Sequence, residues 1–396
     1  MRVTTICRPT GALLLPALLL AACGGQDDSA AGTPAAQTAA TATAGADTGA
    51  ASAAMPASAT SQGGGAVQPD GGPTSNLPPN ELGRFMVLEY HRIGDNEGEW
   101  VRSRANFQKD LETLYQKGYR PITMRQMAEG NIDVPAGTTP VVFTIDDSSR
   151  GQFYYRPDGS IDPNTMMGMW ANFQRKNPGW HYGAVWCILP AAQHPSNFFG
   201  ETPDKETPRA QREATIRKKM EYIVQNRHEA CNHTLYHARL DRGTDAQVQE
   251  WLGRGEDSIK VYLPEDYKIS TMALPLGMWP KNRSLAWRGN WSGRTYEYQT
   301  VLEVSGGASV SPFDSRYNAR SVNRFIVAPG ALERQLAAWD KDPSERFVSD
   351  GDLRTVSYPQ RVADRLDRGK LGGRTARVVP DGAQAGTPAP APAPGS

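Results

Sequence analysis

Short hydrophobic runs alternate with longer amphipathic stretches through the central part of the chain. Arg84–His91 and Val141–Ile145 are apolar enough to form strands, and Phe107–Lys117, between them, carries its apolar residues on one helical stripe. A strand that is hydrophobic throughout is typical of a parallel sheet, because both of its faces are covered. The pattern therefore predicts strands and helices in alternation around a parallel sheet.

The same alternation continues towards the carboxyl terminus. Further strands are expected at Tyr119–Thr123, Gly183–Leu189, Ile269–Leu276, Arg324–Val327 and Thr355–Ser357. Further helices are expected at Met124–Glu129, Asn164–Arg175, Gln211–Gln225 and Val248–Tyr262. Repeated strand–helix units predict an α/β fold: an irregular or partly closed (β/α) barrel with its site residues at one rim. An open doubly wound sheet is the alternative.

Two adjacent carboxylates, Asp146 and Asp147, directly follow one of the predicted strands. We expect them at the carboxyl end of that strand, where α/β barrels and open sheets place their active sites. His233 and His237 are four residues apart, so on a helical turn they would share one face. One aspartate and two imidazoles form a ligand set for a divalent catalytic metal that leaves room for water. The same set suits Fe(II) in an oxygenase, but the second carboxylate favours hydrolysis.

The first 22 residues have the features of an export signal. Two arginines precede the apolar run Leu13–Leu20, which is too short to span a bilayer, and small residues lead to Cys23. The sequence L-A-A-C-G resembles the lipobox of bacterial lipoproteins, which implies cleavage before Cys23 and a lipid on that residue. An ordinary secretory signal is the alternative. The predicted location is the cell envelope, on the periplasmic or surface side of the outer membrane in a Gram-negative host.

Composition divides the exported chain into three parts. Residues 23–80 are rich in Ala, Thr, Gly, Ser and Pro, which predicts a flexible linker between the lipid and the folded body. Residues 360–396 lack aromatic side chains and end in alternating Ala and Pro, which predicts a disordered tail. Residues 81–359 between them are expected to form a single domain.

The net charge bears on possible partners, and the cysteines bear on possible disulfides. The net charge is +1 and no long basic run occurs, so nucleic acid is not an expected partner. Cys187 and Cys231 both lie in apolar, strand-like runs, and two buried thiols are the expectation. A disulfide is compatible with an exported protein, but its pairing cannot be read from sequence alone.

Two motifs resemble those of the NodB-type polysaccharide deacetylases, carbohydrate esterase family 4. The sequence T-I-D-D at residues 144–147 is similar to the family's T-F-D-D, and H-T-L-Y-H at residues 233–237 to its H-[S/T]-x-x-H. The resemblance implies that Asp146 is the general base and that Asp147, His233 and His237 hold one divalent ion. Zinc is expected, with cobalt, nickel or iron as alternatives. The implied reaction is hydrolytic deacetylation of an N-acetylated polysaccharide, an exopolysaccharide or cell-wall glycan, by metal-activated water.

The acid that protonates the departing amine sits late in the sequence of most members, but no histidine follows His237 here. The strand that ends in His91 is similar to the opening strand of rearranged members, which act on poly-N-acetylglucosamine. The resemblance therefore assigns the acid role to His91. A histidine that only caps a strand end is the alternative.

A third family motif, R-x-P-[YF], is altered. Its arginine, which orients the base in many members, is replaced by Ala273, and Leu276 is implied to offer its backbone N–H to the oxyanion. The partner that orients Asp146 is left open among Arg324, Arg316 and Asp314. Because of this departure, a catalytically impaired relative that retains the metal and binds glycan without turnover is an alternative. A polysaccharide O-acetyl esterase on the same site is a further alternative, and protein partners are unknown.

Overall fold

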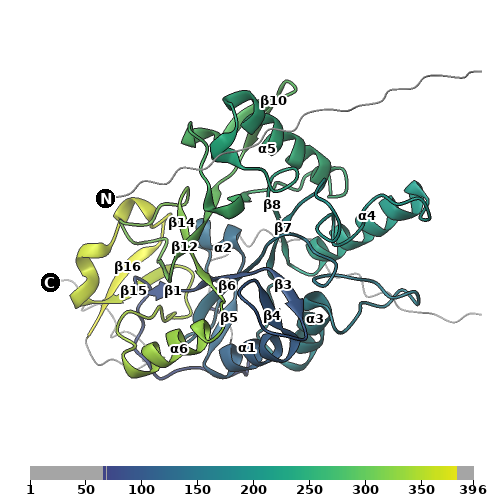
Figure 1. Ribbon diagram of the computed structural model, residues 1–396. Coiled ribbons are helices and arrows are strands. Elements are labelled where there is room, and N and C mark those ends of the chain that lie inside the picture. Colours follow the sequence, from purple (N-terminus) through teal and green to yellow (C-terminus); the bar gives the residue numbers. More distant parts are fainter. Residues whose placement is uncertain (1–65, 68, 381–396) are drawn as a thin grey trace, which may run out of the picture. The chain divides into compact units, whose positions relative to one another are not determined.

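The computed structural model describes residues 66–67 and 69–380 of the chain, and a closed barrel of parallel strands forms its centre (Figure 1). Seven strands close the ring in the order β2, β14, β12, β9, β8, β7, β6, and β6 pairs again with β2. They are β2 (Val87–Tyr90), β6 (Thr139–Ile145), β7 (Val185–Ile188), β8 (Glu229–Asn232), β9 (Thr271–Ala273), β12 (Thr300–Gly306) and β14 (Val322–Ile326). The predicted (β/α) barrel is confirmed, and its ring is complete because β2 pairs with both β6 and β14.

Five helices pack on the outside of the barrel and a short sixth closes one end. The helices are α1 (Arg104–Gln116), α2 (Met124–Ala128), α3 (Met166–Lys176), α4 (Arg209–Gln225), α5 (Asp245–Lys260) and α6 (Ala331–Lys341). The outward side chains of the strands form one core with all of them except α2. Four helices begin at a hydroxyl side chain that accepts a backbone N–H, at Ser103, Thr123, Thr165 and Thr244. All helices expected from the sequence are present, whereas α6 and strand β12 were not predicted.

Alternate residues of the strands fill the barrel in layers, as the two-residue period of a strand requires. Val87, Val142 and Val185 belong to an inner cluster that also contains Cys187 and Cys231. The two cysteines are register partners on β7 and β8, and they form a disulfide. The expectation of two free thiols was wrong, because the parallel register brings these residues side by side.

The α2 helix closes the amino-terminal end of the barrel. Met124 and Met127 of α2 belong to the inner cluster, and Glu229 at the start of β8 accepts a hydrogen bond from the backbone N–H of Arg125 (3.0 Å). Thr271 on the neighbouring strand donates its hydroxyl to the same carboxylate (2.6 Å). The opposite, carboxyl-terminal end carries the predicted site residues.

Short strands form smaller pairs around the barrel. β5 (Tyr119–Pro121) pairs with the first residues of β6 outside the ring. The four two-stranded sheets are β1 (Arg84–Phe85) with β13 (Ser309–Val310), β3 (Arg92–Gly94) with β4 (Val101–Ser103), β10 (Arg288–Trp291) with β11 (Arg294–Glu297), and β15 (Thr355–Pro359) with β16 (Thr375–Val379). The strand expected at Thr355–Ser357 is therefore present, but it lies outside the barrel.

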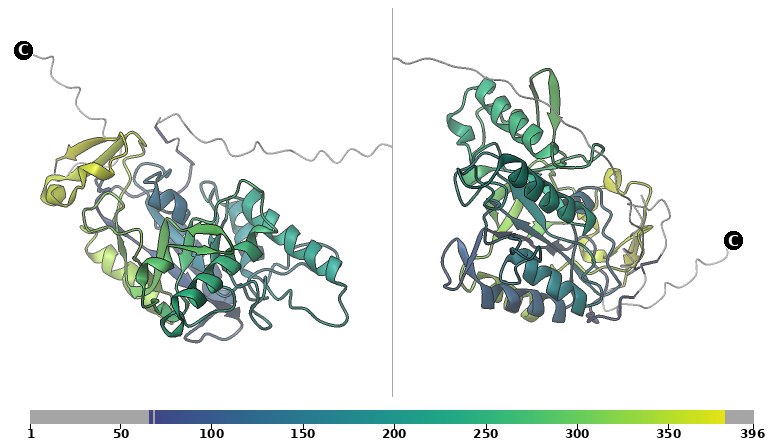
Figure 2. Two further views of the ribbon diagram at one scale, coloured as in Figure 1. Left: turned by 90° about the horizontal axis from the view of Figure 1, so that it is seen from above. Right: turned by 90° about the vertical axis from the view of Figure 1, so that its right-hand side faces the viewer.

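The folded unit extends beyond the boundaries expected at both ends. Asp70 lies in the expected linker, yet its carboxylate forms a buried ion pair with Arg120 (2.6 Å). Asn80 donates its backbone N–H to Val348 (2.8 Å). Residues 360–380, expected in the tail, include β16, which Figure 2 shows in yellow. These segments were misassigned because ion pairs and backbone hydrogen bonds, which composition does not reveal, hold them in place.

The signal peptide over residues 1–22 and the lipidation site at Cys23 lie outside the described residues. Within residues 66–67 and 69–380, no helix is both long and apolar enough to cross a membrane.

Candidate active site

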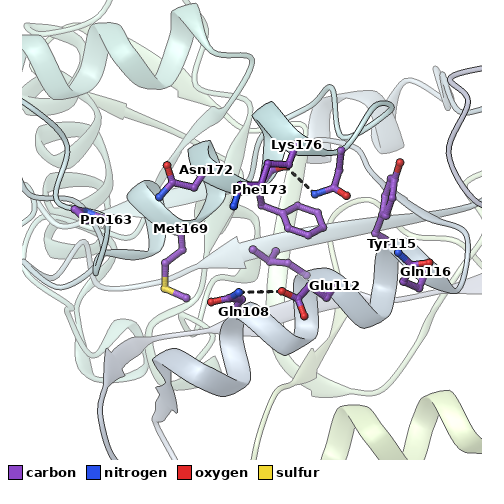
Figure 3. A pocket seen from close by; sticks show the side chains of 11 residues that line it. Gln108, Glu112, Tyr115, Gln116, Pro163, Met169, Asn172, Phe173 and Lys176 are labelled. Atoms are coloured by element: carbon purple, nitrogen blue, oxygen red, sulfur yellow. Dashed lines mark hydrogen bonds between the residues drawn. The ribbon is translucent and has the colours of Figure 1, made fainter.

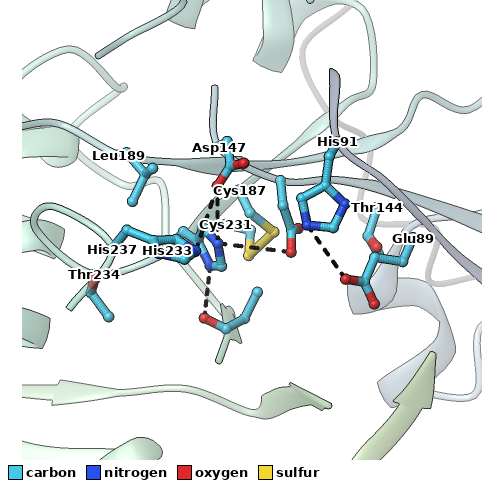
Figure 4. A network of polar contacts seen from close by, with 12 residues as sticks. Glu89, His91, Thr144, Asp147, Cys187, Leu189, Cys231, His233, Thr234 and His237 are labelled. Atoms are coloured by element: carbon cyan, nitrogen blue, oxygen red, sulfur yellow. Dashed lines mark hydrogen bonds and ion pairs between the residues drawn. A yellow bond between two sulfur atoms is a disulfide. The ribbon is translucent and has the colours of Figure 1, made fainter. Parts of the chain in front are cut away.

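The three predicted metal ligands converge at the carboxyl-terminal rim of the barrel (Figure 4). Oδ1 of Asp147 lies 3.6 Å from Nε2 of His233 and 3.7 Å from Nε2 of His237. Donor atoms around a tetrahedral zinc ion, with bonds of about 2.0–2.1 Å, lie about 3.3 Å apart. The observed spacing therefore fits one small divalent ion with only slight closure of the side chains.

The hydrogen bonds of His233 prepare it as a metal ligand. Its Nδ1 lies 2.9 Å from the carbonyl oxygen of Ala273, and because a carbonyl can only accept, Nδ1 must carry the hydrogen. Nε2 then has its lone pair free, and it is buried without a hydrogen-bond partner. An orphaned buried nitrogen that faces a carboxylate is what a metal position requires, so the donor set fits the ion that the sequence implied.

Asp147 is held in a strained conformation at the end of β6. Its φ is 78° and that of Ser148 is 40°, both in the region that non-glycine residues rarely adopt. Ser148 accepts hydrogen bonds from two backbone N–H groups of the loop after β7, from Leu189 to its hydroxyl (3.0 Å) and from Phe199 to its carbonyl (2.7 Å). This loop therefore fixes the turn that aims Asp147 at the histidines.

The two histidines do not lie on a helical turn, which corrects the expectation from their spacing. Thr234 and His237 have φ values of 68° and 67°, so the segment forms a tight irregular turn. The backbone N–H of Thr234 donates to the side chain of Asn232 (2.9 Å), and the Thr234 hydroxyl accepts from Ala238 (2.9 Å). The local hydrogen bonds, rather than helical geometry, bring the imidazoles together.

Electrostatics keep Asp147 ionised. Burial by itself would raise the pKa of this carboxyl, but the neighbouring imidazoles of His233, His91 and His237 hold its pKa well below the usual value. A carboxylate in this state is ready to bind a cation.

Asp146 has a separate partner inside the barrel. Nη1 of Arg324 donates a hydrogen bond to Oδ1 of Asp146 (2.9 Å), and both side chains are almost entirely buried. Burial raises the pKa of Asp146, but the charges of Arg324, His233 and His91 together outweigh burial and hold the pKa below its usual value. Among the three candidates for this role, Arg324 is thus the residue in contact, whereas Arg316 and Asp314 pair with each other (2.6 Å).

His91 lies beside the same carboxylate. His91, Asp146 and Glu89 each bring a donor atom within 4.8 Å of the others. The ring of His91 also packs edge-on against Trp100, with centroids 4.8 Å apart. Burial lowers the pKa of His91, although Asp146 and Asp147 raise it in part. The structure therefore brings the predicted acid and the predicted base to one place.

Leu276 follows β9 on the short turn Pro275–Gly277, with a φ of 57° and a half-exposed side chain. Its position after the strand that ends in Ala273 places it at the same rim. Its role at the oxyanion stays a prediction.

Sequence reasoning missed two residues at this site. Glu89 is completely buried between His91 and Arg324, and its place inside the barrel could have been anticipated from its two-residue spacing to His91. Trp100 carries no local signal, because its contact with His91 comes from the pairing of β3 with β4.

A separate hollow on the described residues lies away from this site. It has a volume of about 330 Å³ and lies between α1 and α3, where Gln108, Glu112, Tyr115, Met169 and Phe173 are among its lining residues (Figure 3). None of the predicted site residues lines it.

The sequence matches no protein-family model and no curated protein. Among solved structures, the chain is similar to a polysaccharide deacetylase from Bacillus cereus, with 15% identity over 64% of this chain and 68% of that chain and a TM-score of 0.45. It is similar to the Streptococcus pyogenes deacetylase PplD in complex with acetate (15% identity, 66% and 98% covered, TM-score 0.44). It is also similar to IcaB from Ammonifex degensii (18% identity, 65% and 97% covered, TM-score 0.43).

Proposed function

We propose that this protein is a metal-dependent hydrolase that removes acetyl groups from an N-acetylated polysaccharide. One observation carries the proposal: the donor atoms of Asp147, His233 and His237 meet within 4.8 Å, and a second carboxylate, Asp146, lies beside them. A ligand set with a spare ionised carboxylate suits hydrolysis, since the spare group can act as a base. The substrate class comes from the resemblance of the two motifs to those of polysaccharide deacetylases.

Asp147, His233 and His237 would hold a divalent ion, with zinc expected and cobalt, nickel or iron as alternatives. Such an ion would lower the pKa of water and stabilise negative charge on the acetyl carbonyl oxygen. Asp146 would accept the proton of the attacking water. Its Oδ2 lies 3.8 Å from Nε2 of His233, and Arg324, His233 and His91 together keep it ionised.

His91 would donate a proton to the departing amine. An amine leaves poorly without protonation, whereas an alcohol needs less help, so a histidine in this place favours an amide substrate over an ester. His91 lies in the same group as Asp146, at the end of the neighbouring strand β2. The contact between Asp146 and Arg324 also supports turnover, because it replaces the arginine missing at Ala273.

The test is release of acetate from oligomers of N-acetylglucosamine by the purified protein, with and without a chelator, followed by reconstitution with single divalent metals. We expect activity that is lost on chelation and restored by zinc. Asp146→Asn should bind metal normally and lose activity. Release from O-acetylated glycans alone would replace the amidase with an esterase, and glycan binding without any release would indicate a binding protein.

We also propose that the protein is exported and anchored through a lipid on Cys23 at the cell envelope. The disulfide between Cys187 and Cys231 supports an oxidising compartment. Ser75 hydrogen-bonds to Gly137 just before β6 begins, whereas Asp146 and Asp147 follow the end of the same strand. The amino-terminal segment of the folded unit therefore meets the barrel at the end opposite the site, which leaves the rim free for a polymer.

Fractionation of cells tests this second proposal. Cys23→Ala should release the protein from the membrane fraction, and Cys7→Ala, within the signal itself, serves as the control. Membrane association that is unchanged in Cys23→Ala would contradict the lipid anchor.

A further inference from the structure

Glu89 is a buried carboxylate that the proposed reaction does not use. It lies on β2 two residues before His91, so both side chains point to the inside of the barrel. The Glu89 side chain is 0% exposed, and neither of its oxygens has a hydrogen-bond partner. A buried charge without hydrogen bonds is costly unless opposite charges balance it.

A guanidinium and an imidazole lie next to this carboxylate. Oε1 of Glu89 is 3.6 Å from Nε2 of His91, and Oε2 is 3.2 Å from Nε of Arg324. The guanidinium of Arg324 reaches Asp146 at the same time, through Nη1 at 2.9 Å. Contacts therefore run from Asp146 through Arg324 and Glu89 to His91, and His91 in turn lies beside Asp146.

We propose that Glu89 is a positioning residue for His91: its carboxylate holds Nε2 of the imidazole and stabilises the cationic ring that gives up a proton. The departing amine takes up that proton. This inference rests on the proposed deacetylation. It explains why the Glu89 carboxylate is buried in the layer directly beneath the site.

A second metal position is the competing explanation, since Glu89, His91 and Asp146 also form a group of three donors. Arg324 argues against it. Its guanidinium already contacts both carboxylates, and a cation placed between them would be repelled by that fixed positive charge. Oε2 of Glu89 contacts Arg324, which leaves Oε1 to contact His91.

The first test is Glu89→Gln, which keeps the shape and removes the charge. We expect kcat on an N-acetyl substrate to fall about 10- to 100-fold, less than the roughly 10²–10⁴-fold that general acid catalysis itself contributes, because the acid is still present. KM should stay within about 2-fold, since Glu89 touches no substrate. On an acetyl ester with a good leaving group, the loss should be much smaller, because that reaction does not need the acid. Equal losses on amide and ester would overturn the proposal.

The second test combines Glu89→Gln with His91→Asn. If Glu89 acts through His91, its substitution costs nothing further once the imidazole is gone, so the two effects are not additive. A residue with a merely structural role would instead give additive losses. Glu89→Asp restores the charge on a shorter side chain and should recover part of the amide activity. Such recovery would show that the loss in the glutamine variant does not come from misfolding alone.

Glu229→Gln is the matched control, since it removes a buried carboxylate inside the same barrel at its far end. We expect it to lower thermal stability and to leave the ratio of amide to ester turnover unchanged. Bound zinc, measured directly, should equal that of the wild type in both glutamine variants. Loss of zinc in Glu89→Gln would overturn the proposal. If the wild-type protein released acetate from none of the acetylated glycans, that result would instead contradict the proposed function.

Discussion

Arg324 and Asp146 are 178 residues apart in the chain, yet Nη1 of the arginine donates a hydrogen bond to Oδ1 of the aspartate across 2.9 Å inside the barrel. Arg324 comes from β14, and Asp146 follows the end of β6. Strand β2 lies between them in the ring and contributes Glu89 to the same guanidinium. The buried guanidinium of Arg324 thus contacts two carboxylates below the site.

Replacement of this arginine should damage both activity and stability. Arg324→Met removes the partner of two buried carboxylates, which we expect to lower the free energy of unfolding by about 3–5 kcal/mol. Acetate release should fall by at least about 100-fold, because the base is no longer oriented. Denaturant unfolding and steady-state kinetics measure the two effects. Arg316→Met is the control, since that residue pairs with Asp314 away from Asp146.

Removal of a metal ligand should abolish metal binding without unfolding the protein. His233→Ala loses the Nε2 donor, and we expect zinc affinity to drop by more than about 100-fold, beyond the loss seen when supporting groups are removed. Competition with a chelator and elemental analysis provide the measurement. His181→Ala, on an exposed loop, should bind zinc as the wild type does. Normal zinc content in His233→Ala would exclude that residue from the metal site.

Stability should fall in mild acid because of His228. Burial lowers the pKa of His228 to about 3, and its Nδ1 accepts hydrogen bonds from Ala184 and Trp186. The unfolded chain, with a histidine pKa of about 6.5, binds a proton below that pH that the folded protein does not. The histidine therefore removes up to about 1.4 kcal/mol of stability for each unit that the pH falls from about 6.5 towards 3.

His228→Gln keeps an acceptor but does not titrate, so the pH dependence of its unfolding free energy should be shallower than that of the wild type between about pH 6.5 and 5. Denaturant titrations at several pH values within this interval give both slopes. Identical slopes would mean that His228 is not buried in its neutral form.

Loss of the disulfide should destabilise the barrel. The bond between Cys187 and Cys231 spans 44 residues of sequence, and removal of such a cross-link costs about 2–4 kcal/mol. We expect the double variant Cys187→Ala and Cys231→Ala to unfold at a lower denaturant concentration than the oxidised wild type. Wild-type protein unfolded in the presence of a reductant should match the variant. Two free thiols in freshly purified, unfolded wild-type protein would contradict the bond.

The sequence by itself determined the parts of the site that depend on neighbouring residues. An apolar run followed directly by Asp146 and Asp147 can only end a buried strand, since two carboxylates cannot lie within it. The spacing of His233 and His237 predicted that the two imidazoles lie together, as they do with ring centroids 5.0 Å apart, and the alternation of strands and helices indicated the barrel. These signals are local, so a single stretch of chain is enough to display them.

Only the tertiary structure decided the rest, because it depends on which strands become neighbours and in which register. Closure of the ring joined β2 to β14 and so placed Arg324 against Glu89 and Asp146. The register of β7 on β8 paired Cys187 with Cys231. Packing likewise turned the histidine segment into an irregular turn instead of a helix. Pairings between distant segments leave no periodic pattern in either segment alone, and strand order and side-chain packing settle them together.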